Sequence, residues 1–337
     1  MKKIRLFFVV IISISFVAFI YILFGYKTTY EKVNITAEIE QAKKNLSPNQ
    51  SIILLDSKNP FSFNDLFIRC DDIINQQVYG ILTMPINSNN HNDSLPAIIG
   101  VAGSKGWGEH HYGYMDRYKE SGFITLTLHS FKSRKISSTV GEQVSATTAM
   151  LVYDAYKALE KLSNDPRIDR ENIGITGWSL GGGVALFTAW KPLKDKLSPN
   201  YIFAAHLPIY PPCMVKPVNL SFTESPIHIL IGEEDNWVPS EACVDLVNSA
   251  NLENLDITTY PQAHHSFDRN QELKYDKDGY SFIDLRLKLT DDGVARTLDL
   301  GFPLSNSISQ KLVLAFCTKR GVTYGGNPEA RDYSSQF

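Results

Sequence analysis

The sequence predicts an α/β fold with a mainly parallel central sheet and helices on both faces, preceded by one apolar N-terminal helix. Three observations support this prediction. Short apolar runs alternate with amphipathic helical patterns along most of the chain, which is typical of βα units. Several of these runs are apolar throughout, as expected for strands that are buried on both faces. A separate run, residues 6–24, is apolar except for Ser13 and Ser15.

The composition is that of a folded globular chain. The 337 residues are 43% hydrophobic and 20% charged, with a net charge of −3. These values exclude a disordered polar chain and a collagen-like repeat. The chain has no basic block of five or more residues, so we expect no nucleic-acid partner.

The apolar run 6–24 would span roughly 28 Å as a helix, close to the thickness of a hydrocarbon core. We favour an uncleaved membrane anchor over a cleaved signal peptide, because the run is long and residues 24–27 (FGYK) offer no A-x-A site. Lys2, Lys3 and Arg5 precede the run and favour a cytoplasmic N-terminus. The rest of the chain would then lie on the periplasmic or extracellular side, and it would be secreted if the run is cleaved.

The chain divides by composition into an anchor over residues 1–26, a polar stalk or linker over 27–50 and one large domain over 51–337. The stalk contains a short helical candidate at Thr36–Asn45, and the polar segment 86–93 resembles a hairpin-type connection. Helices are also predicted at Glu142–Leu162, Ser240–Ala250 and Ser307–Phe316. The predicted strands are Val78–Met84, Ala97–Val101, Phe123–Leu128, Asn172–Thr176, Ala204–Ile209, Ile227–Ile231 and Leu255–Tyr260.

A candidate nucleophile follows the strand Asn172–Thr176. The segment 177–181 reads GWSLG, so Ser179 occupies a G-x-S-x-G motif between a strand and a helical pattern. This sharp turn exposes the serine hydroxyl, and the Leu180 N–H at the helix start would face a developing oxyanion. In this arrangement the acid and then the histidine follow the serine along the chain.

Candidates for both partners lie just past later strands, where an open α/β sheet collects its site. The strand Ile227–Ile231 leads to Glu233, Glu234 and Asp235, of which we favour Asp235 because the glutamates lie at the strand end and suit turn or surface positions. The strand Leu255–Tyr260 leads to His264 and His265, and only one of these can point at the serine.

Residues 75 to about 275 resemble the α/β-hydrolase superfamily, and most closely its dienelactone hydrolase-like branch. The segments that carry the resemblance are 96–108, 165–183, IGEEDNWVP and YPQAHHSF. The branch usually has G-x-x-D-x-x-v-P and A-x-H-x-F motifs, which implies Ser179, Asp235 and His265 as the catalytic triad. Ser179 stands where dienelactone hydrolases proper have cysteine, which favours a serine esterase mechanism over lactone specificity.

The loop 102–108 (AGSKGWG) follows the strand Ala97–Val101 and should supply the second oxyanion donor. We expect this donor to be the N–H of Ser104, with Lys105 as the second choice. Trp107, Trp178 and Trp237 either line the substrate entrance or pack in the core, as His110 and His111 also could. These histidines lack convergent metal-ligand spacing, so we expect neither a metal nor a cofactor.

The expected activity is hydrolysis of small carboxylic esters through an acyl-enzyme. The alternatives are a dienelactone or other lactone hydrolase, a small serine peptidase, and a non-catalytic membrane-anchored binding protein of the same fold. The four cysteines, at positions 70, 213, 243 and 317, are compatible with one or two disulfides or with four free thiols. The sequence assigns no role to residues 276–337.

Overall fold

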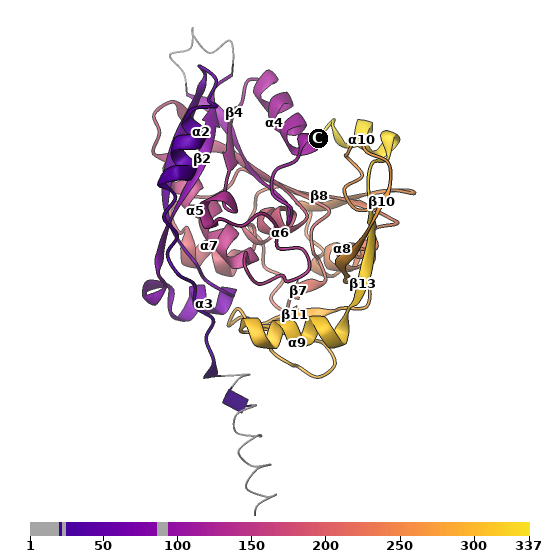
Figure 1. Ribbon diagram of the computed structural model, residues 1–337. Helices are drawn as coiled ribbons and strands as arrows, with labels where there is room; N and C mark the ends of the chain where they lie inside the picture. The colour runs from indigo at the N-terminus through magenta and orange to yellow at the C-terminus, as the bar shows by residue number, and fades with distance from the viewer. Residues whose placement is uncertain (1–19, 22–24, 86–93) are drawn as a thin grey trace, which may run out of the picture.

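The structure is a computed structural model that describes residues 20–21, 25–85 and 94–337 (Figure 1). The expected anchor over residues 6–24 therefore lies outside the described residues, apart from Ile20 and Tyr21. No helix within the described part of the chain is long and apolar enough to cross a membrane.

An eight-stranded sheet forms the centre of the molecule, in the order β1-β2-β4-β3-β5-β6-β8-β9. All neighbouring pairs from β4 to β9 are parallel, whereas β2 pairs antiparallel with β1 and with β4. The mainly parallel sheet is thus confirmed. Its strands are β1 (Gln50–Lys58), β2 (Asn75–Thr83), β3 (Leu95–Val101), β4 (Ile124–Leu128), β5 (Ile168–Trp178), β6 (Ala205–Ile209), β8 (Ile227–Gly232) and β9 (Leu255–Tyr260).

The expectation of a hairpin-type connection over residues 86–93 is wrong. Strands β2 and β3 flank this segment in sequence, but β4 lies between them in the sheet. The chain leaves β3, passes through helix α4 (Glu109–Glu120) and returns as β4, which pairs with both β3 and β2. A hairpin would have required β2 and β3 to be neighbours.

Helices α6 (Leu180–Phe187) and α8 (Ser240–Ala250) follow the strands β5 and β8, which carry active-site candidates at their ends, and α5 (Thr148–Ser163) precedes β5. Helix α5 begins at Thr148 rather than at Glu142, because the Glu142 carboxylate accepts hydrogen bonds from the Val144 and Ser145 N–H groups and forms a turn. The side chain of Thr147 then caps the helix. The helices are α2 (Thr36–Lys43), α3 (Phe63–Ile68), α4, α5 (Thr148–Ser163), α6 (Leu180–Phe187), α7 (Lys191–Leu197), α8 (Ser240–Ala250), α9 (Ser307–Cys317) and α10 (Pro328–Ser334).

The segment 27–50 is packed on the domain and is not a separate stalk. The hydroxyl group of Tyr30 donates to the Val144 carbonyl at 2.5 Å, and the Val33 N–H donates to the Gln76 side chain at 2.8 Å. Ile35 and Ile39 are buried and form a small cluster with Tyr79 of β2. The polar composition of the segment concealed these buried isoleucines, so the packed domain extends N-terminally beyond residue 51.

Residues 274–334 form an addition beside the main sheet, which we call the C-terminal addition. In Figure 1 the strands β10 (Lys274–Ser281) and β13 (Lys319–Tyr324) lie on the β8 side of the molecule, and α9 lies at its lower end near β11. Strands β10 and β13 pair antiparallel, while β11 (Leu287–Leu289) pairs with β12 (Ala295–Thr297) and with β7 (Val215–Pro217). The polar stretch 268–292 supplies β10 and β11.

One disulfide joins Cys213, in the loop after β6, to Cys243 of α8. Cys70 and Cys317 are free thiols. The disulfide therefore links the two segments that follow neighbouring strands of the sheet.

Candidate active site

Ser179 lies between β5 and α6 in a backbone conformation that is unfavourable for a non-glycine residue, with φ 55° and ψ −114°. Glycine is required on both sides of it. A Cβ atom on Gly177 would lie 2.1 Å from the Gly181 carbonyl oxygen, and one on Gly181 would lie 2.0 Å from the Val101 carbonyl oxygen. The two glycines thus allow the tight turn that brings β5, α6 and the end of β3 together at the serine.

A continuous chain of hydrogen bonds connects three of the residues that the sequence singled out. His265 Nε2 lies 3.0 Å from Ser179 Oγ, and His265 Nδ1 lies 2.7 Å from Asp235 Oδ2. The side chains of Asp235 and His265 are almost completely buried. This arrangement can take a proton from the serine hydroxyl and hold the resulting imidazolium beside a carboxylate.

The Asp235 carboxylate is fixed in orientation by the backbone that follows it. Its Oδ1 atom accepts hydrogen bonds from the N–H groups of Trp237 and Val238, both at 2.9 Å. Oδ2 is thereby directed at His265. The neighbouring alternatives Glu233 and Glu234 are exposed.

The alternative histidine, His264, does not point at Ser179. It is half-buried, and its Nδ1 atom has no hydrogen-bond partner among the described residues.

The loop that carries His265 is held by the C-terminal addition, a contact that the sequence analysis missed. The Gly325 N–H donates to the His265 carbonyl at 2.9 Å, just after β13. A Cβ atom on Gly326 would lie 2.0 Å from the Arg269 carbonyl oxygen, so only glycine permits this approach. The glycine-rich sequence 321–330 was the available signal, because close backbone approach is one of the main uses of paired glycines.

The loop 102–108 also lies against the serine. A Cβ atom on Gly103 would lie 3.0 Å from the Trp178 carbonyl oxygen and 3.4 Å from Ser179 Cβ. The Ser104 carbonyl accepts from the Thr139 N–H at 2.9 Å, which holds the loop in place. Lys105 forms an ion pair with Asp276 of β10 at 2.7 Å, so its side chain points toward the C-terminal addition.

The three tryptophans that could line the entrance have different positions. The Trp237 ring lies 5.0 Å from the His265 ring, centroid to centroid, and lines the space beside Ser179. Trp178 is fully buried and packs against the rings of His111 and Tyr114, so it belongs to the core. Trp107 donates to the Leu128 carbonyl and lines a separate hollow at the end of β4. Trp178 nevertheless lines the small hollow beside Ser179 and His265, whereas Trp107 lines neither hollow at the serine.

His110 and His111 begin α4 and lie close together, with ring centroids 3.8 Å apart. Burial, and then the nearby Arg269, lowers the pKa of His110 to about 3. Burial and then His110 hold the pKa of His111 well below its usual range. Both rings are therefore neutral at physiological pH. Across the described residues there is no group of three or more His, Cys, Asp or Glu side chains that could hold a metal ion.

A buried carboxyl group lies behind the histidine loop and was not identified from the sequence. Asp268 Oδ1 accepts a hydrogen bond from the Tyr210 hydroxyl group at 3.0 Å, and the Tyr210 ring lies 4.6 Å from the His265 ring. Asp268 Oδ2 has no partner among the described residues. Burial raises the pKa of Asp268 to about 6. The sequence signal was an acidic residue three positions after His265, directly after Phe267.

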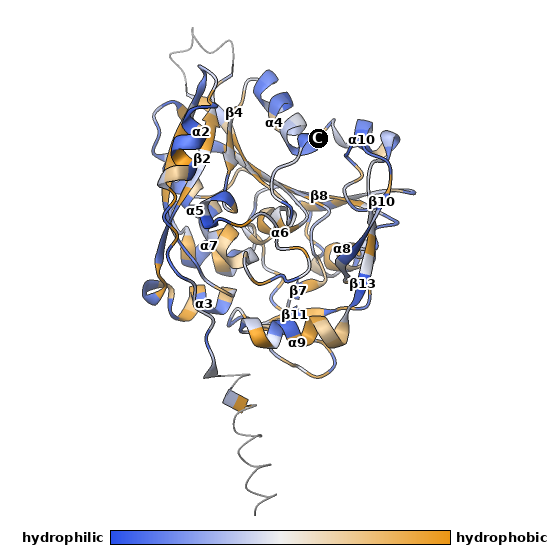
Figure 2. Ribbon diagram, viewed as in Figure 1, coloured by the Kyte–Doolittle hydropathy of each residue, from blue (hydrophilic) through white to orange (hydrophobic). Residues whose placement is uncertain are grey.

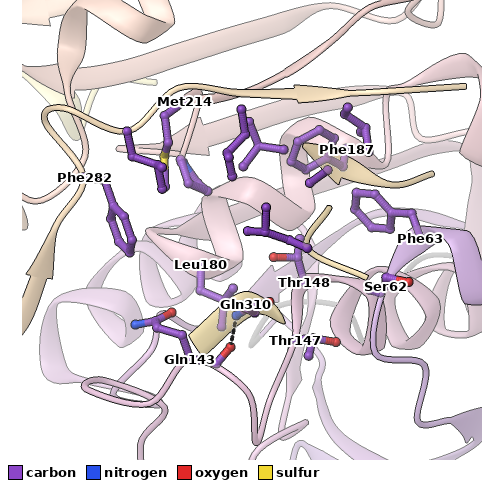
Figure 3. Close-up of a pocket in the computed structure, with 18 of the residues that line it drawn as sticks. Ser62, Phe63, Gln143, Thr147, Thr148, Leu180, Phe187, Met214, Phe282 and Gln310 are labelled. Carbon is purple, nitrogen blue, oxygen red and sulfur yellow. Dashed lines mark hydrogen bonds between the residues drawn. The ribbon is translucent and has the colours of Figure 1, made fainter. Parts of the chain in front are cut away.

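Two hollows meet at Ser179. The larger has a volume of about 190 Å³ and is shown in Figure 3, where Phe63, Phe187, Met214 and Phe282 surround it. The smaller has a volume of about 30 Å³ and is lined by His265. Ser104 and Trp237 line both hollows, so the nucleophile lies at their junction.

The parallel sheet, the serine turn after β5 and the hydrogen-bonded residues at the ends of β8 and β9 define an α/β hydrolase. The sequence model of the dienelactone hydrolase family matches residues 89–281, more than half of the chain, and the protein belongs to this family. The resemblance found in the sequence is thus confirmed, and the protein is a hydrolase that acts on ester bonds.

Solved structures with similar folds include three esterases or related hydrolases. They are Est1E from Butyrivibrio proteoclasticus (14% identity, 56% of this chain and 86% of that chain, TM-score 0.42), a dienelactone hydrolase-like promiscuous phosphotriesterase from metagenomic libraries (16%, 65% and 85%, 0.45) and esterase 2 from Thermogutta terrifontis (16%, 66% and 87%, 0.48). No curated protein sequence matches the chain significantly.

Proposed function

We propose that the protein is a serine esterase that cleaves small carboxylic esters through an acyl-enzyme intermediate. The observation that carries this proposal is the chain of hydrogen bonds from Asp235 through His265 to Ser179. Ser179 stands where dienelactone hydrolases proper have cysteine, and this supports a serine esterase over a dienelactone hydrolase.

In the proposed reaction, Ser179 Oγ attacks the ester carbonyl carbon while His265 Nε2 takes the hydroxyl proton. The carbonyl oxygen becomes an oxyanion, and the backbone N–H groups of Leu180 and Ser104 stabilise it. His265 then gives its proton to the leaving alcohol. A water molecule, deprotonated by His265, attacks the acyl-enzyme and releases the carboxylic acid and the free serine.

Each of the other residues has a supporting role in this proposal. Asp235 keeps the proton on Nδ1 of His265, so that Nε2 is the free base, and it stabilises the imidazolium that forms. The Trp237 and Val238 N–H groups hold the carboxylate in that orientation. The mechanism requires no metal and no cofactor.

Covalent labelling and ester hydrolysis with the Ser179→Ala variant test the proposal. A fluorophosphonate probe should label the wild-type protein at Ser179, and the variant should neither react nor hydrolyse p-nitrophenyl acetate above about one-thousandth of the wild-type rate. Failure of the folded wild-type protein to label would instead support a binding protein of the same fold. A substrate panel that also contains a lactone and a peptide separates the remaining alternatives.

We propose further that residues 1–26 anchor the protein in a membrane and that the catalytic domain lies outside the cytoplasm. The 19 residues 6–24 and the preceding basic residues support this topology. The Cys213–Cys243 disulfide also supports it, because disulfides persist mainly in oxidising compartments. The full chain should sediment with membranes, whereas a chain that starts at Lys27 should stay in solution. Recovery of the full, uncleaved chain in the soluble fraction would overturn the proposal.

A further inference from the structure

The larger hollow beside Ser179 is apolar and holds no charge. It has a volume of about 190 Å³, and none of the described residues that line it is acidic, basic or a histidine. Its polar side chains gather at one edge, where Gln310 donates to the Gln143 carbonyl at 2.5 Å (Figure 3). A cavity with apolar walls of this kind excludes charged groups, because a charge inside it would lose its hydration without compensation.

The C-terminal addition builds much of this cavity. Phe282, Leu285, Leu287 and Leu289 line it from the segment around β11, and Leu314 lines it from α9. All five lie beyond residue 281, where the match to the dienelactone hydrolase family ends. The cavity is therefore built jointly by the matched family region, which contributes residues such as Phe187 and Met214, and by the C-terminal segment beyond it.

Helix α9 has two different faces, one of which lies against the cavity. Val313 and Leu314 are buried, whereas the two residues that follow them, Ala315 and Phe316, are exposed. Figure 2 shows hydrophobic and hydrophilic residues mixed along the helix. Asn306 caps its start by accepting from the Ile308 and Ser309 N–H groups. The helix thus lines the hollow with Leu314 and, at the polar edge, with Gln310.

The position of His265 decides which part of an ester this cavity receives. His265 lines the small hollow of about 30 Å³ together with Tyr210 and Arg269, and it does not line the large one. The leaving oxygen has to lie within hydrogen-bond reach of His265 Nε2 in order to receive its proton. The alcohol group therefore leaves on the side of the small hollow, and the acyl group lies on the side of the large one.

We propose that the large cavity binds the acyl group of the substrate, and that this group is an uncharged apolar chain or ring of about seven carbon atoms. An apolar cavity of about 150 Å³ in another protein binds benzene, so about 190 Å³ accommodates roughly seven carbons. The proposal rests on the proposed serine esterase function, since it assumes an acyl-enzyme at Ser179.

Two series of esters test the assignment. In p-nitrophenyl esters from acetate to dodecanoate, kcat/KM should rise about fourfold per added methylene until about seven carbons, and then level off or fall. In alkyl acetates, where only the alcohol grows, kcat/KM should change little. A flat acyl series, or a rise confined to the alcohol series, would overturn the proposal.

Substitutions in the cavity wall provide the structural part of the test. Ala295 of β12 lines the cavity, and Ala295→Leu adds three carbons to the wall, so the fastest acyl ester should become about three carbons shorter. Leu314→Ala removes three carbons and should move the optimum in the opposite direction. Ala315→Leu is the matched control, because the same change is made on the exposed side of α9 and should leave the optimum in place.

Labelling separates failure of this inference from failure of the proposed function. A small fluorophosphonate should label Ser179 in the wild type and in all three variants, which also shows that each variant is folded. If the wild type does not label, the serine esterase proposal fails. If labelling is normal but the acyl optimum stays where it is in both Ala295→Leu and Leu314→Ala, only the acyl-cavity assignment fails.

Discussion

Asp235 forms three hydrogen bonds with different roles, and this separates its effect on catalysis from its effect on folding. Asp235→Asn can keep the two bonds from the Trp237 and Val238 N–H groups to Oδ1, but the new amide cannot hold His265 in the same tautomer. We expect kcat for ester hydrolysis to fall by about 10⁴-fold with little change in thermal stability.

The neighbouring substitution Glu234→Gln is the matched control, because Glu234 is exposed on the same turn. It should leave kcat unchanged. A similar fall in activity for Glu234→Gln and Asp235→Asn would show that activity depends on the turn and not on the Asp235 carboxylate that bonds to His265.

The buried carboxyl group of Asp268 should make stability depend on pH. Burial raises its pKa from the usual 3.8 to about 6 in the folded protein, so the folded state holds this proton more tightly than the unfolded state does. The resulting contribution to stability is present at low pH and is lost as the pH rises from 3.8 to about 6. Asp268→Asn removes this loss and should raise the free energy of unfolding at pH 8 by about 1–3 kcal/mol.

Urea unfolding at pH 4 and at pH 8 measures this effect. The difference in the free energy of unfolding between Asp268→Asn and the wild type should be small at pH 4 and large at pH 8. Asp299→Asn, in an exposed turn, should show no such difference. A gain of equal size at both pH values would contradict the assignment to a buried titrating carboxyl group.

Local sequence identified Ser179, Asp235 and His265 as candidates because each stands in a motif just past a strand, and the structure brings these three side chains together. Their catalytic roles remain proposals. The positions of Trp178 and Asp268 could not be predicted in the same way. Whether a tryptophan lines a cavity or packs in the core depends on which distant side chains reach it, and here these are His111 and Tyr114 of α4.

At the scale of elements, the disulfide links the loop after β6 to α8 across a sequence separation of 30 residues. Without the disulfide, the unfolded chain is no longer held in a closed loop of this length and has more conformational freedom. The double substitution Cys213→Ala with Cys243→Ala should therefore lower the free energy of unfolding by about 3 kcal/mol. Thermal or urea unfolding under non-reducing conditions measures the loss.

Reducing agent and a second variant control this prediction. A reductant should destabilise the wild type but not the double variant. Cys317→Ala changes an exposed free thiol and should have little effect. Equal stability of wild type and double variant would indicate that the disulfide contributes nothing.

Element boundaries were predictable where local signals agreed. Ser240–Ala250 and Leu255–Tyr260 have the expected bounds, because a helix start with Glu241 and a short apolar run are both local patterns. The start of α5 was misplaced because the Glu142 side chain binds backbone N–H groups ahead of the helix. The order β2-β4-β3 is a long-range property, and the apolar pattern of a strand does not encode its neighbours.

At the scale of the whole molecule, the residues that precede β1 contribute to stability. A chain that starts at Lys44 loses the buried side chains of Ile35 and Ile39 and the Tyr30 hydrogen bond, whereas one that starts at Lys27 keeps them. The shorter chain should be less stable by about 3–6 kcal/mol, mostly from the lost apolar burial. Urea unfolding of the two chains, both without residues 1–26, measures the difference, and identical midpoints would refute the packing role of this segment.

The C-terminal addition holds the backbone of the His265 loop through Gly325 and also supplies the wall of the larger cavity through Phe282 and Leu314. The nucleophile, by contrast, is fixed by β3, β5 and α6, all of which end before residue 188. During synthesis, Ser179 therefore emerges from the ribosome long before the parts that orient its base and shape its substrate cavity. The growing chain carries a serine turn without a finished site, so we expect hydrolytic activity to begin only after the chain as far as Gly325 has been made and folded.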